Sequence, residues 1–101
     1  MPEWLAVCKV DAIADGAGVS LDAGGLRLAV FRSGGELAAL SGICPHSGGS
    51  LGHGWLEEGE VVCPLHRWRF RLVDGRCSTI PGERVHRFRC EVRGDLVWVE
   101  V

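Results

Sequence analysis

The chain has 101 residues, with 47% hydrophobic and 24% charged side chains, and 11 basic against 13 acidic residues give a net charge of −2. We expect residues 1–101 to form a single domain, because this length supports one core and leaves no room for a second catalytic module. The acidic balance argues against nucleic-acid binding, and the lack of any run of about 20 apolar residues argues against a membrane-spanning helix.

The N-terminal part of the sequence predicts β-strands. Residues 4–10 and 26–31 are rich in β-forming side chains, and Gly24-Gly25 marks a turn before the second segment. Gly34-Gly35 then predicts a tight turn into a strand at 36–40. This hairpin leads the backbone directly to Cys44.

The middle of the chain predicts loops and short strands. Residues 47–54 are rich in glycine and serine and favour no regular structure. A short strand is expected at 59–63, and large apolar side chains alternate with charged ones at 68–72. Asp74-Gly75 is a typical hairpin signal.

The C-terminal segment alternates apolar and charged side chains. His86, Phe88, Cys90 and Val92 fall on one side of a predicted strand, which makes His86 a candidate core histidine. A turn at 94–95 leads into a last strand at 96–99. The pattern predicts an all-β fold: an antiparallel base, sandwich- or barrel-like and built from both ends of the chain, with a small subdomain inserted at about 42–82.

Two short motifs indicate a metal centre. Cys44-Pro45-His46 and Cys63-Pro64-Leu65-His66 each carry one thiol and one imidazole in the same order. Ligands repeated in this way from two loops fit a two-iron cluster, with two cysteines on one iron and two histidines on the other. A structural zinc module is the alternative, since a Cys₂His₂ set also suits tetrahedral zinc, although the one-residue gap in the first motif is tight for it.

With these motifs the chain resembles the Rieske ferredoxin-like domain, whose signature is C-x-H followed by C-x-x-H. The flanks at 51–54, 68–70 and 80–83 also resemble that family. The resemblance implies one 2Fe-2S cluster per chain, bound by Cys44, His46, Cys63 and His66. It also implies an exposed position for the two histidines.

The resemblance further implies a function in electron transfer, with no substrate chemistry by the chain alone. We expect a ferredoxin that carries single electrons from a reductase to the terminal oxygenase of a ring-hydroxylating system. The alternative is the small Rieske-like subunit of an NADH-dependent nitrite reductase. The sequence does not indicate the oligomeric state.

The cysteine count and the N-terminus favour a cytoplasmic protein. Five cysteines are an odd number, and two of them are assigned to iron, so a disulfide framework is not the simplest explanation. Free thiols suit a reducing compartment. The N-terminus lacks the basic and apolar segments of an export signal.

Residues around the motifs predict a low reduction potential. High-potential Rieske proteins add a cysteine in each ligand loop and place a serine and a tyrosine after the last histidine. Here Gly49 and Leu65 stand near the disulfide positions, and Trp68 and Phe70 stand near the hydroxyl positions. Without those hydroxyl donors we expect a potential near the low end of the Rieske range, about −150 mV or somewhat above.

The arginines after the second motif raise two further questions. Arg67 follows His66 at a position where the family usually has glycine, so a positive φ there would strain its backbone. Residues 67–93 contain eight arginines and three acidic residues, a local balance of +5. This stretch predicts either a docking rim for an acidic partner or an ordinary solvated strand face.

Overall fold

The computed structural model describes residues 3–45, 48–65 and 67–101. Within these ranges the regular structure consists of antiparallel strands and two short 3₁₀ turns, and none of its helices has the length and apolar character to cross a membrane. The elements are β1 Trp4–Lys9, η1 Val10–Ala12, β2 Ala17–Ala23, β3 Leu26–Ser33, β4 Glu36–Ser41, η2 Leu51–His53, β5 Trp55–Glu57, β6 Glu60–Val62, β7 Arg69–Arg71, β8 Arg87–Phe88, β9 Cys90–Arg93 and β10 Leu96–Glu100.

Paired glycines form the tight turns of the N-terminal strands. Gly24 and Gly25 join β2 to β3 with φ of 57° and 81°, and Gly34 and Gly35 join β3 to β4 with φ of 61° and 82°. Glycine adopts these left-handed conformations without a steric penalty, and such turns match the twist of the flanking strands. The predicted hairpin into Cys44 is confirmed. Strand β2 was not predicted.

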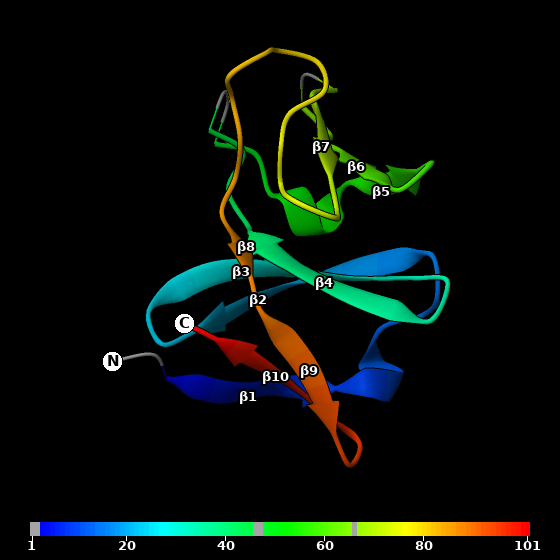
Figure 1. Ribbon diagram of the computed structural model, residues 1–101, viewed down its shortest axis with the longest axis vertical. Coiled ribbons are helices and arrows are strands. Elements are labelled where there is room, and N and C mark those ends of the chain that lie inside the picture. Colours follow the sequence, from blue (N-terminus) through cyan, green and yellow to red (C-terminus); the bar gives the residue numbers. More distant parts are fainter. Residues whose placement is uncertain (1–2, 46–47, 66) are drawn as a thin grey trace.

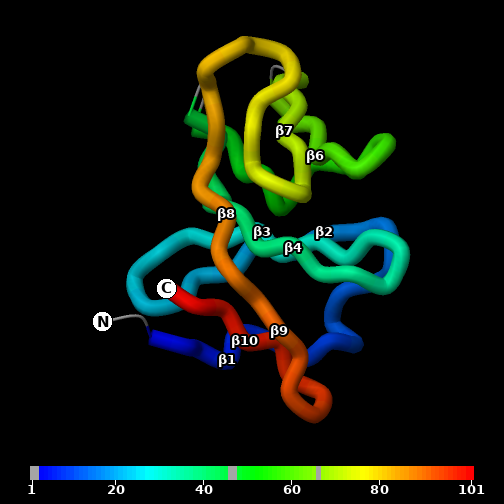
Figure 2. Tube along the Cα trace, viewed as in Figure 1, coloured from blue at the N-terminus to red at the C-terminus, as the bar shows by residue number. Residues whose placement is uncertain are grey.

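The strands form three small sheets, shown in Figure 1. The first has the order β1-β10-β9, the second β2-β3-β4-β8, and the third β5-β6-β7. Strand β1 pairs with β10, so the two ends of the chain meet in one sheet, as Figure 2 shows. The amide of Val101 donates to the carbonyl of Glu3 at 2.8 Å, and the amide of Glu3 donates back at 3.2 Å.

The second sheet is the central layer and is buried on both faces. Four consecutive residues of β3, Leu28 to Phe31, are at most 1% exposed. Leu28 and Val30 pack with Val97 in the core of the base. Ala29 and Phe31 point to the opposite side and pack in a second core. Because neighbouring side chains of a strand face opposite ways, one apolar strand supports both cores.

The second core lies beneath the segment between β4 and β8, residues 42–86, which we call the upper subdomain. It contains the sheet β5-β6-β7 and both metal-binding motifs. Its core includes Phe70 and Leu72 together with Ala29 and Phe31 from the central sheet. The central sheet is therefore the floor on which the upper subdomain is built. The division into one domain at 1–101 with a cluster-binding part at 42–82 stays a prediction.

A close backbone contact joins the upper subdomain to the base. Gly52 in η2 lies against Ser20 of β2, and a Cβ on Gly52 would come within 2.7 Å of the Ser20 backbone. Beside it, the hydroxyls of Ser50 and Ser20 are 3.3 Å apart. Only glycine allows this approach, which holds the end of the loop that carries Cys44 against the central sheet. We call this loop, between β4 and η2, the first ligand loop, and the loop between β6 and β7 the second.

The C-terminal segment differs from its prediction. The expected single strand is interrupted at Arg89: β8 belongs to the central sheet, whereas β9 belongs to the first sheet. His86 is exposed, and Val92 is 48% exposed, so the assignment of His86 to the core was wrong. The reason is physical: a segment that crosses between sheets does not keep one face toward one core.

The middle segment also differs in detail. The 3₁₀ turn η2 forms where only loop was expected, and strand β5 was not predicted. Asp74-Gly75 makes a turn, but the returning segment pairs with β7 only through an isolated bridge between Phe70 and Cys77. The hairpin signal therefore marked a reversal of the chain without a second full strand.

Gly52→Ala is expected to destabilise the protein by about 1–3 kcal/mol, because the new methyl group has to displace backbone atoms of β2. Urea unfolding measures the effect. Ser50→Ala is the matched control, since it removes only one hydroxyl contact at the same junction and should cost less. An equal loss in both variants would contradict the steric explanation.

Candidate metal centre

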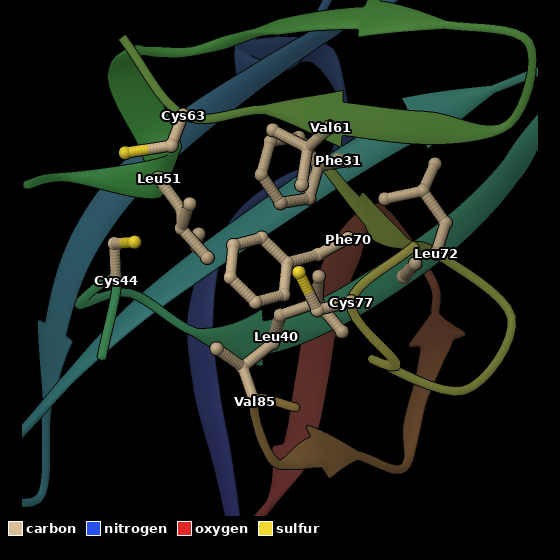
Figure 3. Close-up of a cluster of buried hydrophobic side chains, with 12 residues drawn as sticks. Phe31, Leu40, Cys44, Leu51, Val61, Cys63, Phe70, Leu72, Cys77 and Val85 are labelled. Atoms are coloured by element: carbon tan, nitrogen blue, oxygen red, sulfur yellow. The ribbon is translucent and has the colours of Figure 1, made fainter. Parts of the chain in front are cut away.

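The two cysteines of the motifs are buried at one edge of the second core, which we call the upper core from here on. Cys44 follows β4 and is 1% exposed, and Cys63 follows β6 and is 0% exposed. Figure 3 shows both side chains beside Leu51, on the same side of the buried cluster that contains Phe70. Their predicted partners, His46 and His66, lie outside the described residues. The structure thus brings together the two thiols of the predicted set.

The two loops are closed by the same pair of backbone hydrogen bonds. The amide of Cys44 donates to the carbonyl of Gly49 at 2.8 Å, and the amide of Cys63 donates to the carbonyl of Trp68 at 2.8 Å. In the opposite direction, the amide of Gly48 donates to the Cys44 carbonyl at 2.9 Å, and that of Arg67 donates to the Cys63 carbonyl at 3.0 Å. Each cysteine is therefore held at the same position of an equivalent turn.

This turn requires a left-handed residue four positions after each cysteine. Gly48 has φ of 73° in the first loop, and Arg67 has φ of 60° in the second. The positive φ considered for Arg67 is thus present. A side chain in this conformation is strained by contact of its Cβ with the backbone, by about 1–2 kcal/mol.

The loops touch each other at Gly49. A Cβ on Gly49 would come within 3.2 Å of the Cys63 sulfur and within 3.1 Å of the Leu65 side chain. The positions expected to hold a disulfide in high-potential Rieske proteins thus face each other here, occupied by glycine and leucine. None of the five cysteines of this chain forms a disulfide.

The described part of the site fits an iron-sulfur cluster. Two buried thiols from equivalent loops supply soft sulfur donors, which iron-sulfur clusters use. Outside the masked positions, no group of three or more metal-ligating side chains is found. In the predicted ligand set the other two ligands are His46 and His66, which the motifs place two and three residues after their cysteines.

A third loop, residues 77–83, packs against the same core. Cys77 is 7% exposed and belongs to the buried cluster of Cys44 and Cys63. Its amide donates to the carbonyl of Glu83 at 3.0 Å, which closes the loop, and its sulfur accepts from the amide of Ile80 at 3.4 Å. The tip at Ile80 and Pro81 is exposed. Cys77 is therefore a small buried residue of this core.

Arg69 connects the third loop to the strands of the upper subdomain. Its side chain donates to Glu60 at 2.8 Å and to Glu57 at 3.4 Å. Its backbone amide donates to the Thr79 hydroxyl at 2.9 Å, and its carbonyl accepts from the Ser78 amide at 2.9 Å. One residue of β7 thus holds two carboxylates and two loop residues.

The carboxylates of this network are held in their charged form. A hydrogen bond from the Ser78 side chain, followed by one from Arg69, lowers the pKa of Glu60. A hydrogen bond from Trp55, followed by Arg69, lowers the pKa of Glu57. Both effects have the same cause, since a donor that bonds a carboxylate stabilises its ionised form.

Most arginines of the basic stretch have acidic partners, which favours the solvated-face interpretation over a docking rim. Besides the Arg69 network, the structure shows four further pairings of this kind: Arg71–Asp74, Arg76–Asp74, Arg89–Glu100 and Arg93–Glu91.

Several other cysteine, histidine and tryptophan side chains lie away from the two motif thiols or only pack the cores. Cys8 and Cys90 are half-buried in the core of the base, and burial raises the pKa of each thiol, so both are poor nucleophiles. His53 is exposed. Trp68 packs against the upper core, whereas Trp55 is 43% exposed.

Comparison with known proteins places the chain in a family. The model of the Rieske [2Fe-2S] domain matches residues 3–92. The chain belongs to this family. Its cofactor is accordingly a Rieske-type 2Fe-2S cluster. This finding favours iron and sulfide over the structural zinc of the alternative interpretation.

Relatives of two sizes share this domain. The chain is 36% identical to the oxygenase component of 3-ketosteroid-9-alpha-monooxygenase from Mycolicibacterium smegmatis, over 95% of the chain but 27% of the relative. It is 26% identical to the ferredoxin component of the naphthalene 1,2-dioxygenase system from Pseudomonas aeruginosa, over 98% of the chain and 96% of the relative. The chain thus spans about a quarter of the first relative and nearly all of the second.

Solved structures with the same fold are also of two kinds. A putative NADH-dependent nitrite reductase small subunit from Mycobacterium tuberculosis superposes with a TM-score of 0.91, at 26% identity, over 100% of this chain and 96% of that one. The ferredoxin of carbazole 1,9a-dioxygenase from Nocardioides aromaticivorans gives a TM-score of 0.88, at 28% identity, over 95% of each chain. The all-β Rieske fold is confirmed.

The lowered pKa of Glu60 makes stability depend on pH. A carboxylate whose pKa is lowered in the folded state stabilises the protein at a pH above its ordinary pKa of 4.5. This stabilisation is lost as the pH falls through the folded-state pKa. Glu60→Gln should therefore unfold at a lower urea concentration than the wild type at pH 7, and the difference should shrink below about pH 4. A difference that grows on acidification would contradict this assignment.

Arg67→Gly should relieve backbone strain and raise the free energy of unfolding by about 1 kcal/mol. It should also lower the reduction potential, because a positive charge near the cluster favours the more negative reduced state. Glu58→Gly is the matched control: Glu58, with φ of 50°, is the other described non-glycine residue with positive φ, and lies in the turn between β5 and β6. It should raise stability without lowering the potential. A potential that rises in Arg67→Gly would refute the charge effect.

Proposed function

We propose that Cys44 and Cys63 hold one iron of the 2Fe-2S cluster and that His46 and His66 hold the other. The proposal is supported by the burial of the two thiols, the equivalent turns that carry them, and the place of each histidine in its motif. When bound, a cluster with this ligand set exchanges one electron at potentials between about −150 and +300 mV.

We further propose that the chain is a Rieske-type ferredoxin that carries single electrons from a reductase to a terminal oxygenase and does no substrate chemistry alone. The observation that carries this proposal is the near-complete mutual coverage with the naphthalene dioxygenase ferredoxin component. Oxygenase components match at higher identity but over about a quarter of their length. A cytoplasmic location suits a chain whose five cysteines form no disulfide.

The surface beside the ligand loops suits contact with a redox partner. Leu65 is 59% exposed and Ile80 is 38% exposed, and Pro45, Pro64 and Pro81 are exposed near them on the three loops. Apolar side chains of this kind form the core of transient protein interfaces. The electron would pass between the cluster and the redox partner at this surface, where the two ligand loops and the third loop can approach the partner closely.

A second function is favoured by the solved structures. The nitrite reductase small subunit from Mycobacterium tuberculosis covers the whole chain, and the NirD protein of Escherichia coli is 30% identical over 100% of it. A subunit of that kind would stay bound to a large sirohaem protein, whereas a carrier would dissociate from its partners. Size-exclusion chromatography of the protein from its native host, with absorption spectra of each fraction, separates the two.

Cys44→Ser and Cys63→Ser should each lose the iron and sulfide that the wild type binds, and with them its visible absorption, because a thiolate ligand is removed. Cys90→Ser is the control: this half-buried thiol lies in the other core and should leave the iron content unchanged. Iron and acid-labile sulfide assays and visible spectra give the result. Stoichiometric zinc without iron or sulfide in the wild type would overturn the proposal.

The reduction potential should lie near the low end of the Rieske range, about −150 mV or somewhat above, because Trp68 and Phe70 supply no hydroxyl donor to the cluster. Protein-film voltammetry measures it. A value above about +100 mV would contradict this expectation.

A further inference from the structure

Arg69 links two strands of the upper subdomain to the third loop. Its side chain bonds Glu60 of β6 and Glu57 of β5, while its backbone bonds Ser78 and Thr79 at the start of the third loop. The Ser78 side chain in turn bonds Glu60, which closes a ring of three residues. We call Arg69, Glu60 and Ser78 the clamp.

The clamp borders the second ligand loop. Arg69 follows Trp68, whose carbonyl accepts from the amide of Cys63 at 2.8 Å. The third loop packs its Cys77 into the core that contains Cys44 and Cys63. A shift of the third loop would therefore change how much solvent reaches the ligand loops.

The clamp is well suited to fix that loop. The Arg69 side chain is 32% exposed and the Glu60 side chain 19% exposed, so their pairing is less screened than that of a fully exposed pair. The planar guanidinium can bond two carboxylates at once, which a lysine cannot reproduce. The loop is closed by the hydrogen bond from the Cys77 amide to the Glu83 carbonyl, and its tip at Ile80-Pro81-Gly82 is exposed.

We propose that Arg69 is a positioning residue: through the clamp it fixes the third loop over the ligand loops and thereby sets the reduction potential of the cluster. This inference rests on the proposed ligand set. Loss of the clamp should admit water to the ligand loops, and because water stabilises the more negative reduced state, the potential should rise.

The sign of the potential shift separates positioning from a simple charge effect. Removal of the positive charge in Arg69→Gln would lower the potential if the charge acted directly, and removal of the negative charge in Glu60→Gln would raise it. If both residues act by holding the loop, both variants should raise the potential, as should the uncharged change Ser78→Ala. Arg69→Lys keeps the charge and should also raise it.

Hydrogen exchange tests the loop directly and does not depend on the cluster. In Arg69→Gln, Glu60→Gln and Ser78→Ala, amides of residues 77–83 should exchange about tenfold faster than in the wild type, which corresponds to loss of one charge-assisted hydrogen bond. Mass spectrometry of the holoprotein measures exchange, and voltammetry measures the potential of the same samples.

Arg27 and Asp22 supply a matched control. They form an ion pair with a 2.6 Å contact between β2 and β3, in the base of the protein. Arg27→Gln and Asp22→Asn change the net charge by the same amounts as the clamp variants, and should alter neither exchange in 77–83 nor the potential.

The outcomes are distinct. Upward shifts in all clamp variants with faster loop exchange support the proposal. Opposite shifts in Arg69→Gln and Glu60→Gln, or unchanged exchange in 77–83, overturn it. A wild type without iron and sulfide would overturn the proposed ligand set and the effect on potential, whereas the exchange data would still show whether the clamp holds the loop.

Discussion

The closure of each ligand loop around its cysteine is the constraint on which the site depends. The backbone amide and carbonyl of each cysteine both form hydrogen bonds within its own loop. Each thiol can therefore be buried without leaving the backbone groups of its cysteine unpaired. The same closure requires a left-handed residue at positions 48 and 67. Glycine meets this requirement in the first loop, whereas the second loop accepts a strained arginine.

The surroundings of the thiols are apolar where high-potential relatives have polar groups. Phe70 fills the centre of the upper core, and Leu65 occupies the space opposite Gly49. These residues exclude water and supply no hydroxyl donors, which makes the added electron harder to accommodate. Arg67 acts in the opposite direction by charge. We therefore expect the potential to reflect a balance between packing and electrostatics.

Much of this organisation could be predicted from the sequence because its signals are local. Paired glycines specify tight turns, and the two short motifs specify the thiols and their loops. The clamp could not be predicted, since Arg69, Glu60 and Ser78 meet only after three strands and a loop have packed. His86 was misplaced for a related reason: periodicity cannot show that a segment passes from one sheet to another.

The positions of the two chain ends have a consequence for how this fold can be used. Glu3 and Val101 are hydrogen-bonded neighbours, and Figure 1 shows the adjoining strands β1 and β10 in the base, on the far side of β3 and β4 from the third loop. A host polypeptide could therefore enter and leave at nearly one point, and the redox-active pole would stay undisturbed. Such a geometry makes the fold a module that evolution or an engineer can splice into larger assemblies, or permute circularly, without rebuilding its metal-binding end.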